Sequence, residues 1–232
     1  MSDSTKVTFT NTYVTPIITA AVNTITEIHM LMPDSILFGS ILMYFLTQNI
    51  SFGIFAIFIF ETVISHKLIS WVSAQTFGSS RPVDIKCRSG YKTPQFNPQR
   101  IFLHDPYPSY GLFSITSIAT YLSLATSQFS STLDAMGDEW AFRKSMAYGC
   151  SAIFVGASLA YRLAKCDTVG DAAIAIVLAI LVGAIFFYIN RAIFGVESMN
   201  FLGLPYLVSK ESEGSPIYIC AADKQDTGSN TA

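Results

Sequence analysis

Long apolar runs separated by short polar links make up most of the chain between residues 35 and 195. A membrane-spanning helix needs about 20 predominantly apolar residues. Four runs approach or exceed that length: 36–64, 110–129, 146–161 and 172–189. The pattern therefore predicts an all-α membrane protein with about four transmembrane helices, in a membrane domain over residues 35–195.

The first run, residues 36–64, is longer than one upright helix needs and shorter than two complete spans. Its polar positions are few, and two of them, Gln48 and Asn49, lie together near its middle. We favour one long tilted helix that emerges from the bilayer. The alternative is a shallow hairpin that turns at Gln48 and Asn49.

The polar N-terminus, residues 1–34, contains an amphipathic pattern over residues 16–32. Apolar residues share one helical face there, and polar residues such as Glu27 lie largely opposite. Because the polar face lacks Lys and Arg, this helix suits packing on protein as well as on lipid. Pro33 and Asp34 then predict that one helix ends and the next begins.

Residues 77–109 are rich in proline and other turn formers and cannot sustain a long helix, so they are expected to form the largest central extramembrane loop. The loop contains more Lys and Arg than Asp and Glu. In a four-span arrangement, a small majority of all Lys and Arg lies on the side of this loop. Since cytoplasmic loops carry an excess of these residues, the count favours a cytoplasmic loop with both termini on the opposite side.

Polar residues within the apolar runs are few, so each is a candidate for a role in the membrane. Glu61 lies near the end of the first run and is followed by Trp71, a residue type that anchors helices at lipid headgroups. We interpret Glu61 as a marker of the membrane boundary. The alternative is a carboxylate that handles protons or ions and faces the run 110–129. Thr116 and Thr120 share a face of that run, which is typical of an interior helix.

Small residues recur at four-residue spacing in the last two apolar runs. They are Ala152, Gly156 and Ala160 in one run and Ala175, Ala179 and Gly183 in the other. Because such stripes allow two helix backbones to approach closely, we expect these two helices to pack on each other as a tight hairpin. The alternative is a chance excess of alanine in two apolar helices.

Composition agrees with a membrane protein, since 51% of the residues are hydrophobic, 13% are charged and the mean hydropathy is +0.44. The net charge of -2 offers no basic excess for nucleic acid, so the lipid bilayer is the expected partner. The histidines lie in separate segments, and the chain has no GxSxG, HExxH or phosphate-binding glycine motif. We therefore expect no enzymatic activity, no cofactor and no metal.

Four cysteines, Cys87, Cys150, Cys166 and Cys220, are widely spaced and form no zinc motif. Cys150 lies in an apolar run and suits a packing role. For the other three, the sequence does not say which of them form a disulfide.

The end of the last apolar run continues as NRAIFGVESMNFLGLPYLV, with GSPIYIC further on. This segment resembles the C-terminal region of multi-span membrane proteins encoded by nucleocytoplasmic large DNA (giant) viruses. The resemblance is carried by Asn190, Phe194, Gly195, Glu197, Asn200, Phe201, Leu202, Gly203, Pro205 and residues 216–220. It implies a virus-encoded protein of the virion inner membrane or of a remodelled host endomembrane.

The C-terminal region, residues 196–232, suggests an ordered cap at the membrane surface, in which polar side chains anchor the chain and a glycine and a proline turn it back. The candidate cap residues are Glu197, Asn200, Gly203 and Pro205. The alternative is an ordinary amphipathic segment beside the membrane. Residues 217–220 fit a short strand, and the polar tail after them is expected to be disordered.

Three functions fit these features. We favour a structural or scaffolding membrane protein that contacts other membrane or capsid proteins through loop 77–109 and the C-terminal cap, and a homo-oligomer fits this role. The second is a small oligomeric ion channel or permeability protein that uses Glu61 and the hydroxyl face of residues 110–129. The third is a protein that curves the membrane by inserting residues 36–64 as a hairpin.

Overall fold

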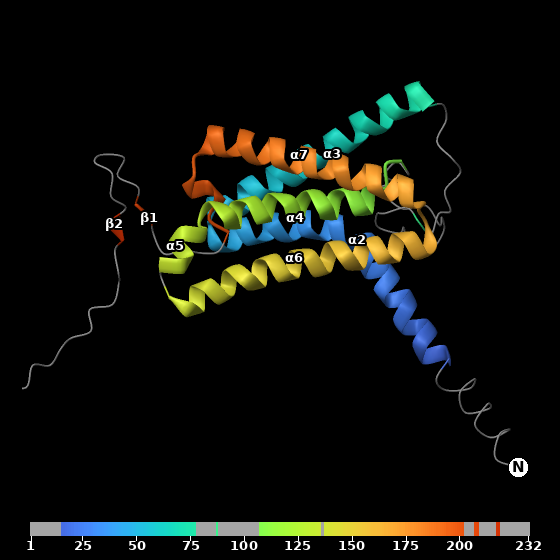
Figure 1. The fold of residues 1–232 in the computed structure, drawn as a ribbon, viewed down its shortest axis with the longest axis horizontal. Helices are drawn as coiled ribbons and strands as arrows, with labels where there is room; N and C mark the ends of the chain where they lie inside the picture. Colours follow the sequence, from blue (N-terminus) through green and yellow to red (C-terminus); the bar gives the residue numbers. More distant parts are fainter. Residues whose placement is uncertain are drawn as a thin grey trace, which may run out of the picture.

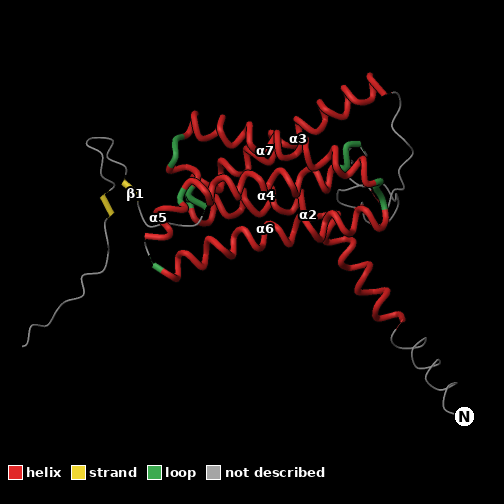
Figure 2. The backbone as a smooth tube through the Cα atoms, in the orientation of Figure 1, coloured by secondary structure: helices red, strands yellow, loops and turns green. Residues whose placement is uncertain are grey.

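The computed structural model describes residues 15–77, 87, 107–135, 137–201, 207–208 and 217–218, and within them the chain is helical apart from one short strand pair (Figure 1 and Figure 2). In chain order the elements are α2 (Thr15–Thr47), α3 (Ile50–Phe77), α4 (Tyr110–Gln128), α5 (Ser130–Ala135), α6 (Asp138–Lys165), α7 (Val169–Phe194), the short helix η3 (Glu197–Met199), β1 (Leu207–Val208) and β2 (Ile217–Tyr218). The two strands pair antiparallel. The all-α class is confirmed, and a strand begins where one was expected.

Helices α2, α3, α4, α6 and α7 form a bundle in which consecutive helices run in opposite directions (Figure 1). Helix α4 lies in the middle, between α7 on one side and α6 on the other. The link from α6 to α7 lies at one end of the bundle, and α5 and η3 lie at the other. The N-terminal part of α2 and the C-terminal part of α3 extend past the other helices at the end that holds the α6–α7 link.

The first apolar run is two helices and not one, because α2 ends at Thr47 and α3 begins at Ile50. Gln48 has a φ of 52°, in the left-handed region that interrupts a right-handed helix. The Asn49 side chain then accepts a hydrogen bond from the Ser51 N–H at 3.0 Å, which caps the start of α3. The expectation of one long helix over residues 36–64 is therefore wrong, since the polar pair supplies both the turn and the cap.

Pro33 does not separate two helices, because α2 continues through it from Thr15 to Thr47. An internal proline removes one backbone hydrogen bond and crowds the turn before it. The residues that follow, including Ile36 and Leu37, pack against the core and hold this half of α2 in place. The amphipathic helix expected over residues 16–32 is thus part of a longer helix, and the expected boundary at Pro33 is wrong.

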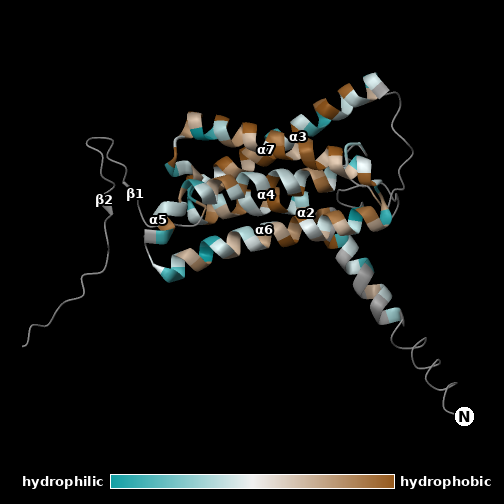
Figure 3. Cartoon of the chain, viewed as in Figure 1, coloured by the Kyte–Doolittle hydropathy of each residue, from teal (hydrophilic) through white to brown (hydrophobic). Residues whose placement is uncertain are grey.

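Two described helices are long and apolar enough to cross a membrane: Ile50–Thr76, within α3, and Val169–Phe194, which is α7. Leu31–Thr47, within α2, is apolar but shorter. Length and hydropathy therefore support two of the four expected spans. Large apolar side chains such as Phe45 and Leu46 are about 70% exposed, and Figure 3 shows hydrophobic positions along α3 and α7. Water-soluble proteins rarely expose contiguous apolar surface on this scale.

Helix α4 is the centre of the core, and every residue from Tyr110 to Ile118 is buried. Further along α4, the ring of Tyr121 stacks on Phe58 of α3 with centroids 3.9 Å apart. The same ring contacts Phe187 of α7 edge-on at 5.6 Å. The expectation that residues 110–129 form an interior helix is confirmed.

The two small-residue stripes do not pack on each other. Ala175, Ala179 and Gly183 of α7 are buried against α4, where a Cβ on Gly183 would lie 2.7 Å from the Ser117 carbonyl oxygen and 3.1 Å from the Thr120 Cβ. In contrast, Ala152, Gly156 and Ala160 of α6 are exposed, and a Cβ on Gly156 would meet no atom of the described residues within 4 Å. The expected α6–α7 stripe contact is wrong because α4 lies between these helices along most of their length (Figure 1).

Candidate functional site

A hydrogen bond between Glu61 and Asn190 joins two helices inside the bundle. The Asn190 amide nitrogen of α7 donates to a Glu61 carboxylate oxygen of α3 at 3.1 Å, across 129 residues of sequence. Asn190 is 1% exposed, whereas Glu61 is half-buried. Tyr121 of α4 packs on Phe58 of α3 and Phe187 of α7, which precede Glu61 and Asn190 by three residues in their helices. Three helices therefore meet at one polar site.

The position of Glu61 differs from the expected one. The interpretation as a boundary marker assumed a span that begins near Ser40, but α3 begins at Ile50 and continues to Phe77. Glu61 consequently lies near the middle of its helix and is directed to α7. The assumption that placed Glu61 at a helix end is wrong, because the turn at Gln48 resets the start of the span.

The hydroxyl face of α4 is in the interior, where the Thr120 hydroxyl bonds to its own helix and the Thr116 hydroxyl has no hydrogen-bond partner among the described residues. Thr116 is buried, and Thr120 is half-buried beside Gly183 of α7. The Thr120 hydroxyl donates to the Thr116 carbonyl oxygen at 2.8 Å. This bond satisfies the hydroxyl donor within its own helix. The described hydrogen-bond partner of the Glu61 carboxylate is Asn190 of α7, whereas the alternative expectation placed this carboxylate against the hydroxyl face of α4.

Asn190 and Tyr121 were not among the sequence-based site candidates. A signal for Asn190 exists, because it continues the buried face of α7 at helical spacing after Ala179, Gly183 and Phe187. A polar residue on a face of small and aromatic residues is a candidate for an interhelical hydrogen bond. No comparable signal marks Glu61 as its partner, since that pairing depends on how α3 and α7 cross.

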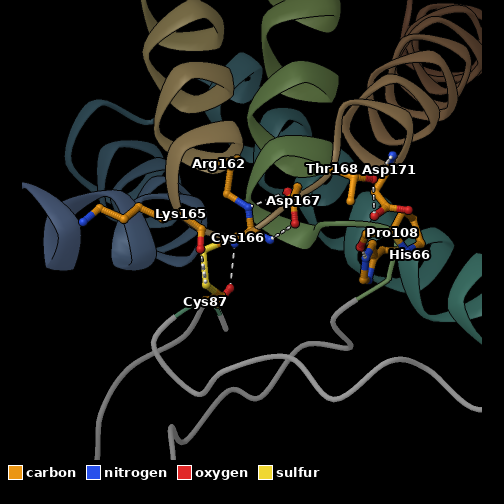
Figure 4. Close-up of polar contacts among 9 residues, drawn as sticks. All are labelled: His66, Cys87, Pro108, Arg162, Lys165, Cys166, Asp167, Thr168 and Asp171. Carbon is orange, nitrogen blue, oxygen red and sulfur yellow. Dashed lines mark hydrogen bonds and ion pairs between the residues drawn. A yellow bond between two sulfur atoms is a disulfide. The ribbon is translucent and has the colours of Figure 1, made fainter.

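A second polar cluster lies where α6 ends and α7 begins (Figure 4). The guanidinium of Arg162 is 2% exposed and donates two hydrogen bonds to the Asp167 carboxylate, each 2.8 Å long. A third donor of Arg162 reaches the Cys87 carbonyl oxygen at 2.6 Å. Cys87 is joined to Cys166 by a disulfide with a Cα–Cα distance of 5.7 Å. We refer to Cys87, Arg162, Cys166 and Asp167 as the disulfide cluster.

The first turn of α7 adjoins the disulfide cluster. Thr168 is the N-cap of α7, and its hydroxyl oxygen accepts a hydrogen bond from the Asp171 N–H at 3.3 Å. The Asp171 carboxylate lies in this first turn, where the helix dipole favours a negative charge. Asp171 therefore stabilises the start of α7.

His66 links α3 to the start of α4. Its Nε2 lies 2.6 Å from the Pro108 carbonyl oxygen, and its fully buried ring contacts the rings of Tyr110 and Phe113 (Figure 4 shows the contact with Pro108). Within the described ranges, no group of three or more His, Cys, Asp or Glu side chains is arranged to hold a metal ion. The histidine thus connects two helices at the same end of the bundle as the disulfide cluster.

The candidate cap is only partly described. Glu197 is exposed at the start of η3, and Asn200 is half-buried. The neighbouring Met199 is 1% exposed and accepts a hydrogen bond from the Tyr121 hydroxyl at 3.3 Å. The chain after α7 therefore folds back onto the bundle, as expected for a cap. Gly203 and Pro205 fall outside the described residues.

Comparisons of this chain with protein-family models, curated proteins and solved structures find no match. The function is accordingly argued from the packing and polar contacts of the bundle.

Proposed function

We propose that the protein is a structural integral membrane protein whose bundle crosses a lipid bilayer. The proposal is supported by the apolar outer surface, by the two helices of sufficient length and hydropathy, and by the other helices that run beside them. Helix α4, with 19 residues, is about 28 Å long, which suits a hydrocarbon core of about 30 Å. In this proposal α2 from Leu31 onward, α3, α4, α6 and α7 all cross, so there are five spans and not four.

The observation that carries the structural role is the hydrogen bond between Glu61 and Asn190. Polar side chains inside a membrane are expensive, and most of them either bind helices together or line a path for ions or substrates. Here the carboxylate is directed to the amide of a neighbouring helix, and the nearby Tyr121 is surrounded by aromatic rings of α3 and α7. This arrangement favours a residue that holds helices together.

In the structural role, loop 77–109 and the cap that begins at Glu197 contact partner proteins. The proposed partners are other membrane proteins, capsid proteins or a second copy of this chain. The location in a virion inner membrane or a virus-modified host membrane rests on the resemblance of the C-terminal segment. The membrane anchors the bundle, and the polar segments at its two ends remain accessible.

Ion flux into proteoliposomes tests this role against that of a channel. We expect the purified protein to give no cation flux above that of empty liposomes, and Glu61→Gln and the control Glu197→Gln to behave like the wild type. The channel alternative is favoured by one observation, the carboxylate near the middle of α3. A cation flux that Glu61→Gln abolishes and Glu197→Gln retains would overturn the structural role in favour of a channel.

The same proteoliposomes test the membrane-curving alternative, which is favoured by the α2–α3 turn at Gln48 and Asn49. Liposomes that contain the protein are expected to stay spherical in electron micrographs. Tubulation at low protein density, together with absence of flux, would instead support a curvature function.

A further inference from the structure

The disulfide cluster has an implication for how the protein lies in the membrane. The disulfide joins residues separated by 79 positions, and it ties Cys87 of loop 77–109 to the end of α6. Arg162 reinforces this tie, because it contacts both the Asp167 carboxylate and the Cys87 carbonyl oxygen. The loop is therefore attached to this end of the bundle at Cys87, by the disulfide and by a hydrogen bond from the buried Arg162 guanidinium (Figure 4).

Formation of this disulfide requires an oxidant. Two thiols lose two electrons and two protons when the S–S bond forms, and a protein disulfide of an oxidoreductase accepts them and becomes a dithiol. Such oxidoreductases act in the endoplasmic reticulum lumen and other oxidising compartments, whereas cytosolic thiols are kept reduced. A structural disulfide between Cys87 and Cys166 therefore points to an oxidising compartment at this end of the bundle.

The charge distribution points the other way, since the Lys and Arg of loop 77–109 favour a cytoplasmic position. The positive-inside rule is a statistical excess of Lys and Arg in cytoplasmic loops. The disulfide, in contrast, is a covalent bond that forms only where an oxidant is present. One of the basic residues at this end, Arg162, is also neutralised by the Asp167 carboxylate and removed from solvent. The covalent bond is the stronger constraint on the compartment.

We propose that the disulfide cluster and loop 77–109 face an oxidising compartment, and that the C-terminal cap faces the cytosol. The two positions follow from α7, which leaves the disulfide cluster at Val169 and ends at Phe194, at the opposite end of the bundle. Partners of loop 77–109 are then lumenal or extracellular protein surfaces, and partners of the cap are cytosolic proteins. This orientation rests on the proposed membrane-spanning function.

Glycosylation in sealed microsomes tests the orientation of the full-length chain. Tyr91→Asn creates the acceptor Asn-Lys-Thr within loop 77–109, and Thr227→Asn creates Asn-Gly-Ser in the tail. Both variants carry Asn49→Gln, because residues 49–51 already form an Asn-Ile-Ser acceptor at the α2–α3 turn. We expect glycan on the Tyr91→Asn variant alone, visible as a gel shift that an endoglycosidase removes.

Every other pattern overturns the orientation. Glycan on Thr227→Asn alone reverses it but leaves the membrane-spanning function intact. Glycan on both variants, or on neither, also contradicts it, and extraction with alkaline carbonate then decides whether the membrane-spanning function fails as well. A chain released by carbonate is not an integral membrane protein, whereas a chain retained in the pellet loses only the proposed orientation.

The state of the thiols is a second readout on the same membranes. In a variant with Cys150→Ala and Cys220→Ala, the remaining cysteines are Cys87 and Cys166. We expect a polyethylene-glycol maleimide to add to two sites after reduction and to none before it. Addition to both sites without reduction would remove the basis of the orientation.

Discussion

Gly183 provides the sharpest test of how the helices pack. In Gly183→Ala the new methyl group would lie 2.7 Å from the Ser117 carbonyl oxygen, and a backbone oxygen cannot move aside by a side-chain rotation. Helices α4 and α7 must then separate, and overpacking of this kind typically costs about 1–3 kcal/mol. For a chain of this size we expect the midpoint of thermal unfolding to fall by about 2–12 °C.

Gly156→Ala is the matched control, because it adds the same methyl group to the exposed stripe of α6, where no atom of the described part of the chain lies within 4 Å. This variant is expected to leave the midpoint unchanged or to raise it slightly, since alanine favours a helix over glycine. Both variants can be compared in detergent micelles by intrinsic tryptophan fluorescence during heating. A fall in Gly156→Ala with no fall in Gly183→Ala would refute the reasoning and would support a contact between the α6 and α7 stripes.

Three further predictions concern the polar contacts. In a double-mutant cycle with Glu61→Leu and Asn190→Leu, we expect a coupling free energy of about 0.6–1.7 kcal/mol, measured by unfolding in SDS. A coupling near zero would show that the hydrogen bond does not hold α3 to α7. Arg162→Leu is expected to destabilise the chain by about 3–5 kcal/mol because it leaves the buried Asp167 carboxylate unpaired. Adding Asp167→Leu should recover part of that loss, and a double variant no more stable than the single one would speak against the ion pair. Cys87→Ser opens a loop closed across 79 residues and should lower the free energy of unfolding by at most about 4.5 kcal/mol. Dithiothreitol should have no further effect on the stability of this variant. A continued response of the variant to the reductant would argue against this disulfide.

Several features were predictable from the hydrophobic pattern because they depend on local sequence. The interior helix expected over residues 110–129 is α4, Tyr110–Gln128, and the run 172–189 lies within α7. The Ser and Thr content of α4 indicated an interior position, since these residues present little volume to neighbours and can hydrogen-bond to neighbouring helices or to their own backbone. Such patterns predict that a helix forms and that it is buried, even where they do not predict which helix it packs against.

The features that were missed depend on pairing between distant segments. The stripe on α7 predicted a close approach to another helix, but it did not say that α4 would be that helix. The turn at Gln48 was expected only as the alternative to one long helix, because continuous apolar sequence on both sides leaves no change of period to mark a boundary. The contact between Arg162 and Cys87 joins positions 75 residues apart, and nothing local to either residue indicates the other.

The central claim, that the bundle crosses a bilayer with α2 and α3 as separate helices, is tested most directly by cysteine labelling in sealed membranes. Gln48→Cys and Gln75→Cys, each in a background with Cys150→Ala and Cys220→Ala, place exposed thiols at the two ends of α3, about 40 Å apart along the helix. We expect an impermeant maleimide to label these two positions from opposite sides of the membrane. Protection of Gln48→Cys from both sides until detergent is added would contradict the claim, because it would return position 48 to the middle of a single long span.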